Sequence, residues 1–235
     1  MGWISVVGIS RAGAVGALGL SIIAAGAPLP AAPAGGVITG VITTQEPERP
    51  AVRVTIDPVV CGSTLPDESL IRDAAGHVAN AIVTIPGIKA PAPAEALVSN
   101  DHCRFVPHVA LLRPGGAVKM TSQDAVLHTM HAAAADGRAF FNISLPIPKM
   151  TASRTLDKAG PVTLSCSTHT WMRGYLYVTD ELAAISASDG RFRLEDVPAG
   201  THELRVWHES LKTAQPIKVI VKDAETTVVE VKLTR

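Results

Sequence analysis

Short runs in which apolar and polar residues alternate dominate the chain and predict β-strands along almost its whole length. Residues 36–44 (GVITGVITT) are rich in β-branched residues, and in residues 227–233 (TVVEVKL) valine and leucine alternate with charged residues. Residues 51–56 (AVRVTI) alternate in the same way, and Val52, Val54 and Ile56 are predicted to share one face of a strand. Helical periodicity is almost absent. We therefore predict an all-β protein.

Turn signals from 19 glycines and 17 prolines separate the remaining runs. Pro86 and Gly87 predict a turn, residues 90–96 (APAPAEA) predict a linker or domain edge, and residues 150–160 lack clear periodicity and predict a loop. The other predicted strands lie within residues 79–87, 103–112, 117–122, 125–133, 139–146, 161–166, 190–209 and 217–221.

Length and charge limit the function classes. A chain of 235 residues can form one large domain or two small ones, and we expect two. Lys plus Arg equals Asp plus Glu at 21 each, so no global field favours nucleic acid, an acidic membrane surface or a strongly charged substrate. Partner choice must therefore depend on local surface.

Residues 1–34 have the pattern of an export signal. Arg11 precedes an apolar, small-residue run from Ala12 to Ala27, and residues 32–34 (APA) resemble a cleavage site. The run is short for a membrane span, and a retained anchor is the alternative. A single arginine, instead of a pair, favours unfolded export with cofactor loading outside the cytoplasm. We predict a periplasmic or secreted protein whose mature chain begins near Gly35.

Three cysteines, Cys61, Cys103 and Cys166, are an odd number for an exported protein. Two spare thiols would tend to oxidise outside the cytoplasm. Pairing Cys61 with Cys103 leaves Cys166 free for a metal, provided that the fold brings the pair within disulfide geometry.

The segment LSCSTHTWMRGYLYV, residues 164–178, places a cysteine, a histidine and a methionine within one short stretch. Alternation in residues 161–166 puts Cys166 on the inward face at the end of a strand, and His169 and Met172 follow on the next loop. A thiolate, an imidazole and a thioether are typical ligands of a soft metal. A trigonal copper site needs a second imidazole, and His128 is the candidate.

Cys-x-x-His-x-x-Met alone is a weak signal, because cysteine and methionine are ordinary core residues. His128, the glycine turn before residue 117 and the export signal together favour the metal site. On a strand, His131 points away from the face of His128; on a helix, the two could share a different metal.

Residues 103–180 resemble a cupredoxin, a blue-copper Greek-key β-sandwich. The resemblance lies in FVPHVALLRPGGAVKM (105–120), QDAVLHTMH (123–131), CSTHTWM (166–172) and GYLYV (174–178), and the Cys-x-x-His-x-x-Met spacing is that of amicyanin-like members. The resemblance implies one mononuclear type 1 copper, with His128, Cys166 and His169 as equatorial ligands and Met172 as the weak axial ligand.

Two positions depart from the family pattern. Thr129 stands where many members have an asparagine that braces the site, and Thr170 stands where a proline often follows the second histidine. Both departures bear on the rigidity of the ligand loop and on the reduction potential of the site, because hydrogen bonds around the ligands tune both. Because His169 is the ligand on the loop, we expect it to reach the surface and to admit electrons.

Residues 186–209 (SASDGRFRLEDVPAGTHELRVWHE), with predicted turns at residues 188–190 and 198–200, resemble a carboxypeptidase regulatory-like (transthyretin-like) β-sandwich, which has an Asp-Gly turn and a Pro-x-Gly turn. Residues 35–44 and 73–87 resemble its opening strands. The predicted domains are a signal peptide (1–34), the opening strands of this sandwich (35–95), an inserted plastocyanin-like cupredoxin domain (96–180) and the closing strands (181–235).

These observations predict an exported blue-copper protein that carries single electrons between a redox-protein donor and acceptor, and not an enzyme. The flanking module has no acid pair, Ser-His-Asp arrangement or zinc-protease motif. One alternative is copper storage or delivery, in which Met120, Met130 and Met150 would help to bind Cu(I). The other is a metal-free recognition module, which an aromatic content of only 4% disfavours.

Overall fold

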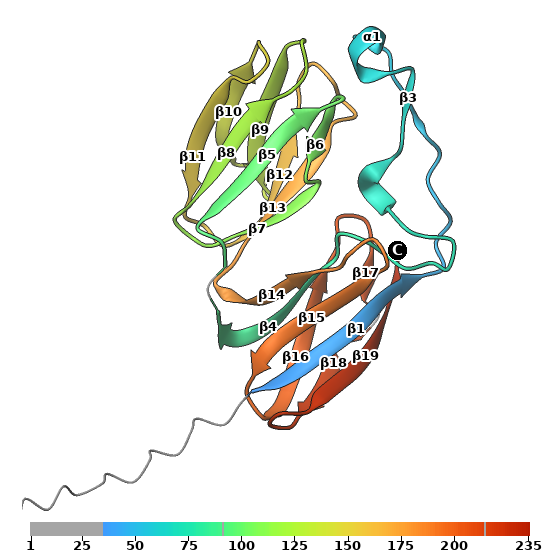
Figure 1. The fold of residues 1–235 in the computed structure, drawn as a ribbon, viewed down its shortest axis with the longest axis vertical. Helices are drawn as coiled ribbons and strands as arrows, with labels where there is room; N and C mark the ends of the chain where they lie inside the picture. The colour runs from blue at the N-terminus through green and yellow to red at the C-terminus, as the bar shows by residue number, and fades with distance from the viewer. Residues whose placement is uncertain (1–34, 91, 214) are drawn as a thin grey trace, which may run out of the picture. The chain divides into compact units, whose positions relative to one another are not determined.

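The alternating strands build two β-sandwiches, each with its own hydrophobic core (Figure 1). The computed structural model describes residues 35–90, 92–213 and 215–235, so the predicted export signal lies outside the described residues. Helical structure in this part of the chain is confined to α1 (Pro58–Cys61) and the 3-10 turn η1 (Glu68–Leu70), and neither is long and apolar enough to cross a membrane. The prediction of an all-β protein is confirmed.

The central sandwich packs a five-stranded sheet on a four-stranded sheet. Inward side chains of both sheets, among them Phe105, Met120, Met130 and Leu164, are buried in its core. The five-stranded sheet has the order β10 (Ala139–Leu145), β9 (His128–Ala134), β12 (Gly160–Ser165), β13 (Arg173–Val178) and β7 (Val109–Leu112). The four-stranded sheet has the order β11 (Thr151–Leu156), β8 (Gly116–Ser122), β5 (Glu95–Asp101) and β6 (Arg104–Val106).

The flanking sandwich has two four-stranded sheets around Ile38, Ile85, Leu194 and Leu204. One has the order β15 (Arg191–Val197), β1 (Gly36–Thr44), β19 (Thr226–Thr234) and β17 (Lys212–Thr213). The other has the order β14 (Glu181–Ile185), β4 (Ile82–Lys89), β16 (Gly200–Trp207) and β18 (Ile217–Val221). Its core therefore combines strands that precede and strands that follow the central sandwich; its assignment to the transthyretin-like class and the domain boundaries stay predictions.

Between β1 and β4 the chain runs through a segment that we call the strap, residues 52–70, which contains β2 (Val52–Arg53), α1, β3 (Thr64–Leu65) and η1. The disulfide Cys61–Cys103 joins the strap to the central sandwich, with 5.1 Å between the two Cα atoms. The predicted pairing is confirmed. Although the predicted range 35–95 gave the strap to the flanking sandwich, Val54, Cys61 and Leu65 are buried in the central core.

The predicted strand at residues 51–56 is wrong beyond Arg53. Val52 and Arg53 pair with β3, but Asp57 turns the chain with a φ of +52°, and Ile56 is 43% exposed. Pro58 then starts α1, since proline fits the first helical position. Val52, Val54 and Ile56 therefore share no buried face.

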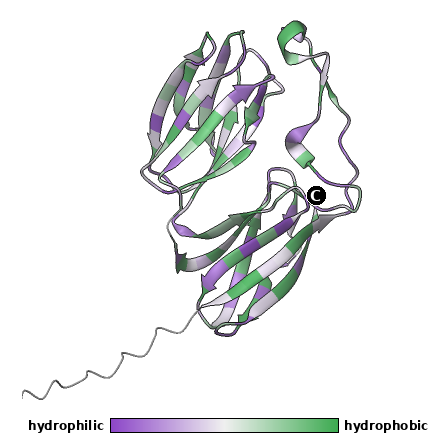
Figure 2. Ribbon diagram, viewed as in Figure 1, coloured by the Kyte–Doolittle hydropathy of each residue, from purple (hydrophilic) through white to green (hydrophobic). Residues whose placement is uncertain are grey.

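Two local predictions fail, one at an edge strand and one at a bulge; Figure 2 shows the hydropathy of the described residues along the strands. The predicted loop 150–160 contains edge strand β11, in which only Leu156 is buried. In the predicted linker 90–96, residues 92–94 form no strand, and β5, which pairs in parallel with β8, begins only at Glu95. The predicted turn at residues 86–87 lies inside β4, where the register with β14 shifts and Gly87 has a φ of +82°.

Candidate metal centre

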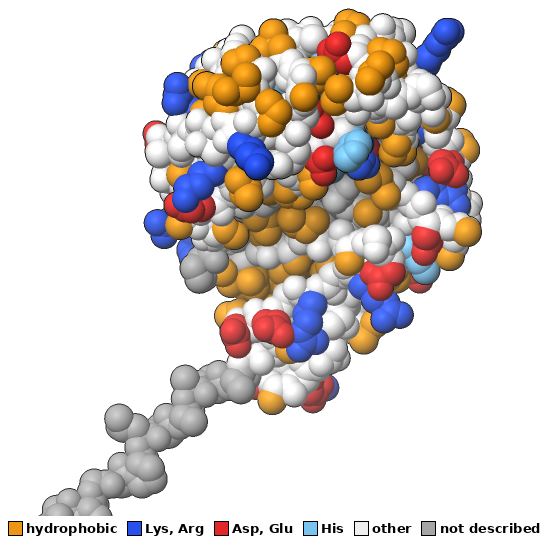
Figure 3. Space-filling view, turned by 45° about the horizontal axis from the view of Figure 1, so that its top comes forward, with side chains coloured by type: hydrophobic (Ala, Val, Ile, Leu, Met, Phe, Trp, Pro, Cys, Tyr) orange, Lys and Arg blue, Asp and Glu red, His pale blue; other side chains and the backbone are white. Residues whose placement is uncertain are grey.

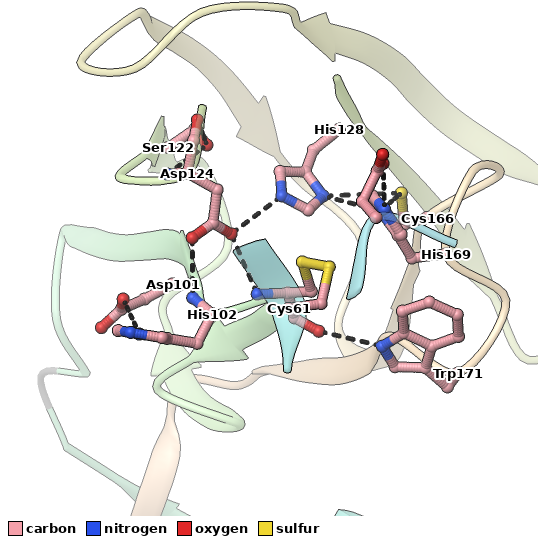
Figure 4. The surroundings of a disulfide bond; sticks show 11 residues. Cys61, Asp101, His102, Ser122, Asp124, His128, Cys166, His169 and Trp171 are labelled. Carbon is pink, nitrogen blue, oxygen red and sulfur yellow. Dashed lines mark hydrogen bonds and ion pairs between the residues drawn. A yellow bond between two sulfur atoms is a disulfide. The ribbon is translucent and has the colours of Figure 1, made fainter. Parts of the chain in front are cut away.

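The candidate ligands converge at one end of the five-stranded sheet (Figure 4). His128 is the first residue of β9, Cys166 directly follows β12, and His169 lies on the loop to β13. Antiparallel pairing of Ser165 with His131 brings the end of β12 next to the start of β9. Sheet register therefore closes the 38-residue gap between His128 and Cys166.

The three donor atoms form a small triangle. Cys166 Sγ lies 3.9 Å from His128 Nδ1 and 3.7 Å from His169 Nδ1, and the two Nδ1 atoms are 3.1 Å apart. A metal bound at about 2.0–2.1 Å from nitrogen and about 2.3 Å from sulfur places such donors roughly 3.3–3.8 Å apart. The residues present therefore fit a metal ion of this size held by two imidazoles and one thiolate.

The triangle is closed to solvent. His128 and His169 have no exposed surface and Cys166 is 4% exposed. This corrects the expectation that His169 reaches the surface, because the strap lies against its outer edge: Asp57 Oδ2 is 3.0 Å from His169 Nε2. Trp171, whose ring centroid is 5.1 Å from that of His169, also packs against the ligand and donates its Nε1–H to the Cys103 carbonyl.

Each imidazole carries a carboxylate on its other nitrogen. Asp124 Oδ2 lies 2.8 Å from His128 Nε2, and Asp57 occupies the same position on His169. Asp124 is itself anchored, since it accepts the backbone N–H groups of His102 and Cys103. A carboxylate on Nε2 keeps the proton there and leaves Nδ1 for a metal. Both Nδ1 atoms point to Cys166.

Thr129 braces the cysteine. Its backbone N–H and its hydroxyl lie 3.4 Å and 3.7 Å from Cys166 Sγ, and the hydroxyl oxygen accepts the Ser167 N–H at 2.7 Å. The threonine therefore ties β9 to the ligand loop, although it stands where an asparagine is usual in the family that the sequence resembles.

The electrostatics prepare Cys166 as a ligand. Burial alone would raise the pKa of its thiol, but hydrogen bonds from His128, the Thr129 N–H and His169 outweigh burial and lower the pKa to about 5. Burial would lower the pKa of His128, yet its bonds to Asp124 and Cys166 raise it to about 9. The pKa of Asp124 is lowered, because the donors around it outweigh its burial. At neutral pH without metal, Cys166 is therefore a thiolate beside an imidazolium.

The other two sequence candidates have different outcomes. Met172 is 1% exposed and its N–H donates to the His169 carbonyl, which closes the loop into a turn; its thioether as an axial ligand stays a prediction. His131 lies on strand β9 with a parity opposite to that of His128, as predicted for a strand, and its Nδ1 is 3.5 Å from Ser165 Oγ.

Sequence reasoning missed both carboxylates. Asp124 precedes His128 by four residues in QDAVLH, a local signal that could have been read. Asp57 is 112 residues from His169, and no spacing rule connects them.

No protein-family model and no curated protein sequence matches the chain. Solved structures resemble part of it. A purple cupredoxin from Nitrosopumilus maritimus is 20% identical with a TM-score of 0.32, covering 36% of this chain and 99% of its own. A mutant of amicyanin in its reduced state is 22% identical with a TM-score of 0.33, covering 41% of this chain and 98% of its own. Similarity at this level does not assign a function to the chain.

Proposed function

We propose that the protein is a type 1 copper protein that carries single electrons and performs no substrate chemistry. The observation that carries the proposal is the buried triangle of His128, His169 and Cys166, the one cysteine outside the disulfide. Two imidazoles and a thiolate are the equatorial donors of blue-copper sites, and a bound copper would supply the Cu(II)/Cu(I) couple. Met172, on the same loop, is the proposed weak axial ligand.

The surrounding residues suit a site that holds its geometry through a redox cycle. Asp124 and Asp57 fix the imidazoles, and Thr129 fixes the sulfur, so the donors keep their positions whichever charge the metal carries. Complete burial excludes water from the ligands. These features favour outer-sphere electron transfer over catalysis at an open coordination position.

Redox proteins are the proposed partners. Hydrophobic side chains gather on the face shown in Figure 3. Among the exposed large hydrophobic residues, Ile56 and Leu127 directly precede Asp57 and His128, and Val59 on α1 is 98% exposed. An apolar surface next to the ligands would let a partner approach without strong charge complementarity. The disulfide supports the proposed periplasmic or secreted location, since such bonds persist in oxidising compartments.

The test is a visible spectrum of the purified protein after addition of Cu(II), alongside Cys166→Ser, His128→Ala and the matched control His131→Ala. We expect an intense thiolate-to-copper band that Cys166→Ser and His128→Ala abolish and His131→Ala keeps. Colourless binding of several Cu(I) ions would instead indicate storage or delivery. Failure to bind copper would leave a two-sandwich recognition protein.

Met120 and Met130 are fully buried in the core, which disfavours a thioether cluster for storage.

A further inference from the structure

The strap has no sequence signal that links it to the metal centre, yet it forms the outer wall of His169. It is held at two places: the disulfide fixes Cys61 to Cys103, and Val54 and Leu65 are buried in the central core. Pairing of β2 with β3 closes the strap on itself. Its position therefore depends on covalent and apolar contacts that involve no metal.

Asp57 is the strap residue that hydrogen-bonds a ligand, and the sulfur of Cys61 also lies within 4.8 Å of a ring nitrogen of His169. It adopts the left-handed conformation (φ 52°, ψ 43°), and its carbonyl accepts the N–H groups of Val60 and Cys61. This turn aims the carboxylate at His169 Nε2, 3.0 Å away, while the Asp57 side chain stays 38% exposed on its other side. A non-glycine residue in this conformation is uncommon, and such residues gather at functional sites.

Among the described residues, His169 Nε2 has no hydrogen-bond partner other than Asp57. The His169 side chain has no exposed surface, so water cannot satisfy its Nε2–H. Without Asp57, the donor would lose its carboxylate partner, so water would have to enter through the opened edge or the ring would have to turn. Asp124 makes the equivalent contact on His128, so both imidazoles are oriented by a carboxylate.

We propose that Asp57 is a positioning residue of the metal centre: delivered by the disulfide-anchored strap, its carboxylate holds His169 with Nδ1 towards Cys166 and seals the outer edge of the ring. For its copper measurements this inference rests on the proposed function. Its thiol-labelling measurements depend only on the fold of the metal-free protein. It implies that electrons reach the centre through the strap or beside Trp171, and not across a bare imidazole edge.

The first test compares Asp57→Asn and Asp57→Ala with Asp67→Asn. Asp67 lies on the same strap, but its carboxylate accepts the Ser69 N–H and contacts no ligand. In the copper-loaded protein we expect both Asp57 variants to lose about 10- to 100-fold in copper affinity, the usual cost of removing an outer-shell partner. The reduction potential should rise, because a less basic imidazole stabilises Cu(II) less. Asp67→Asn should change neither.

The second test needs no metal. Cys166 is the only free thiol in the wild type and remains the only cysteine in the double variant Cys61→Ser/Cys103→Ser. The rate at which a thiol reagent labels metal-free protein therefore reports the closure of the ligand cluster in both. We expect faster labelling in Asp57→Ala and in the double variant, and no further increase when the two changes are combined.

The outcomes separate the two proposals. Wild-type affinity, potential and labelling rate in both Asp57 variants would overturn the positioning role. If the wild-type protein bound no copper, the proposed function would fail, but the labelling rates would still decide whether Asp57 holds His169. If the double cysteine variant did not fold, the Asp57 variants, which keep the disulfide, would decide alone.

Discussion

At the scale of single residues, hydrogen-bond partners determine the protonation of the metal centre. Asp124 and Cys166 hold a proton on His128, whose pKa of about 9 lies well above neutrality, while the pKa of Cys166 is about 5. A metal requires His128 Nδ1 free and Cys166 as a thiolate, so binding must displace any proton still present.

This balance predicts the number of protons that copper binding releases. Near pH 7 His128 should contribute about one proton and Cys166, already ionised, none. As the pH falls through 5, Cys166 should contribute about one further proton, because its thiol is then protonated. Calorimetry in buffers of different ionisation enthalpy measures the count. A constant value across this range would contradict the pKa assignment for Cys166.

Thr129 gives a second prediction at this scale. Thr129→Val keeps the shape and the backbone N–H but removes the hydroxyl that contacts Cys166 Sγ and accepts the Ser167 N–H. We expect a loss of about 1 kcal/mol in the free energy of unfolding. The reduction potential should fall, since a sulfur with fewer donors stabilises Cu(II). Ser167→Ala keeps its backbone N–H and should match the wild type in both denaturation and voltammetry.

At the scale of elements, turns with positive φ join successive strands. The predicted turn at residues 188–190 is present: Gly190 has a φ of +71°, and a Cβ there would lie 2.6 Å from the Ile42 carbonyl oxygen. Gly137 has a φ of +82° with nothing within 4 Å of its Cβ position. Comparing alanine substitutions at Gly190 and Gly137 therefore separates the cost of backbone strain from the cost of a steric clash.

Gly137→Ala should cost only the strain of the left-handed conformation, about 1–2 kcal/mol. Gly190→Ala should cost clearly more, because β1 must also move away from the new methyl group. Chemical denaturation measures both. Equal losses would show that the turn relaxes without disturbing β1.

Sequence patterns located the elements that bury one face and missed those that do not. β1, β9 and β12 carry strong alternation and were predicted, whereas edge strand β11 buries only Leu156. The same limit applies to the site. Cys166 and His169 follow from local spacing, but Asp57 reaches His169 only through a disulfide-held strap, a tertiary contact that no periodicity encodes.

At the scale of the whole molecule, the metal centre links parts of the chain that are distant in sequence. His128 begins β9, Cys166 directly follows β12 of the same sheet, and Asp57 is brought in from the strap. The unfolded chain does not hold these groups together, so copper should bind the folded state and stabilise it by mass action.

The size of this stabilisation is predictable. At a free copper concentration of 100 times the dissociation constant, the gain should be about 2.7 kcal/mol. Scanning calorimetry should show that copper raises the midpoint temperature of unfolding of the wild type and of His131→Ala, and that it does not raise that of Cys166→Ser. Gly190→Ala lowers stability in the flanking sandwich, which shares no ligand with the site, and should show the same gain from a lower baseline. A comparable gain in Cys166→Ser would mean that copper binds the folded protein elsewhere, and the triangle of donors would no longer account for it.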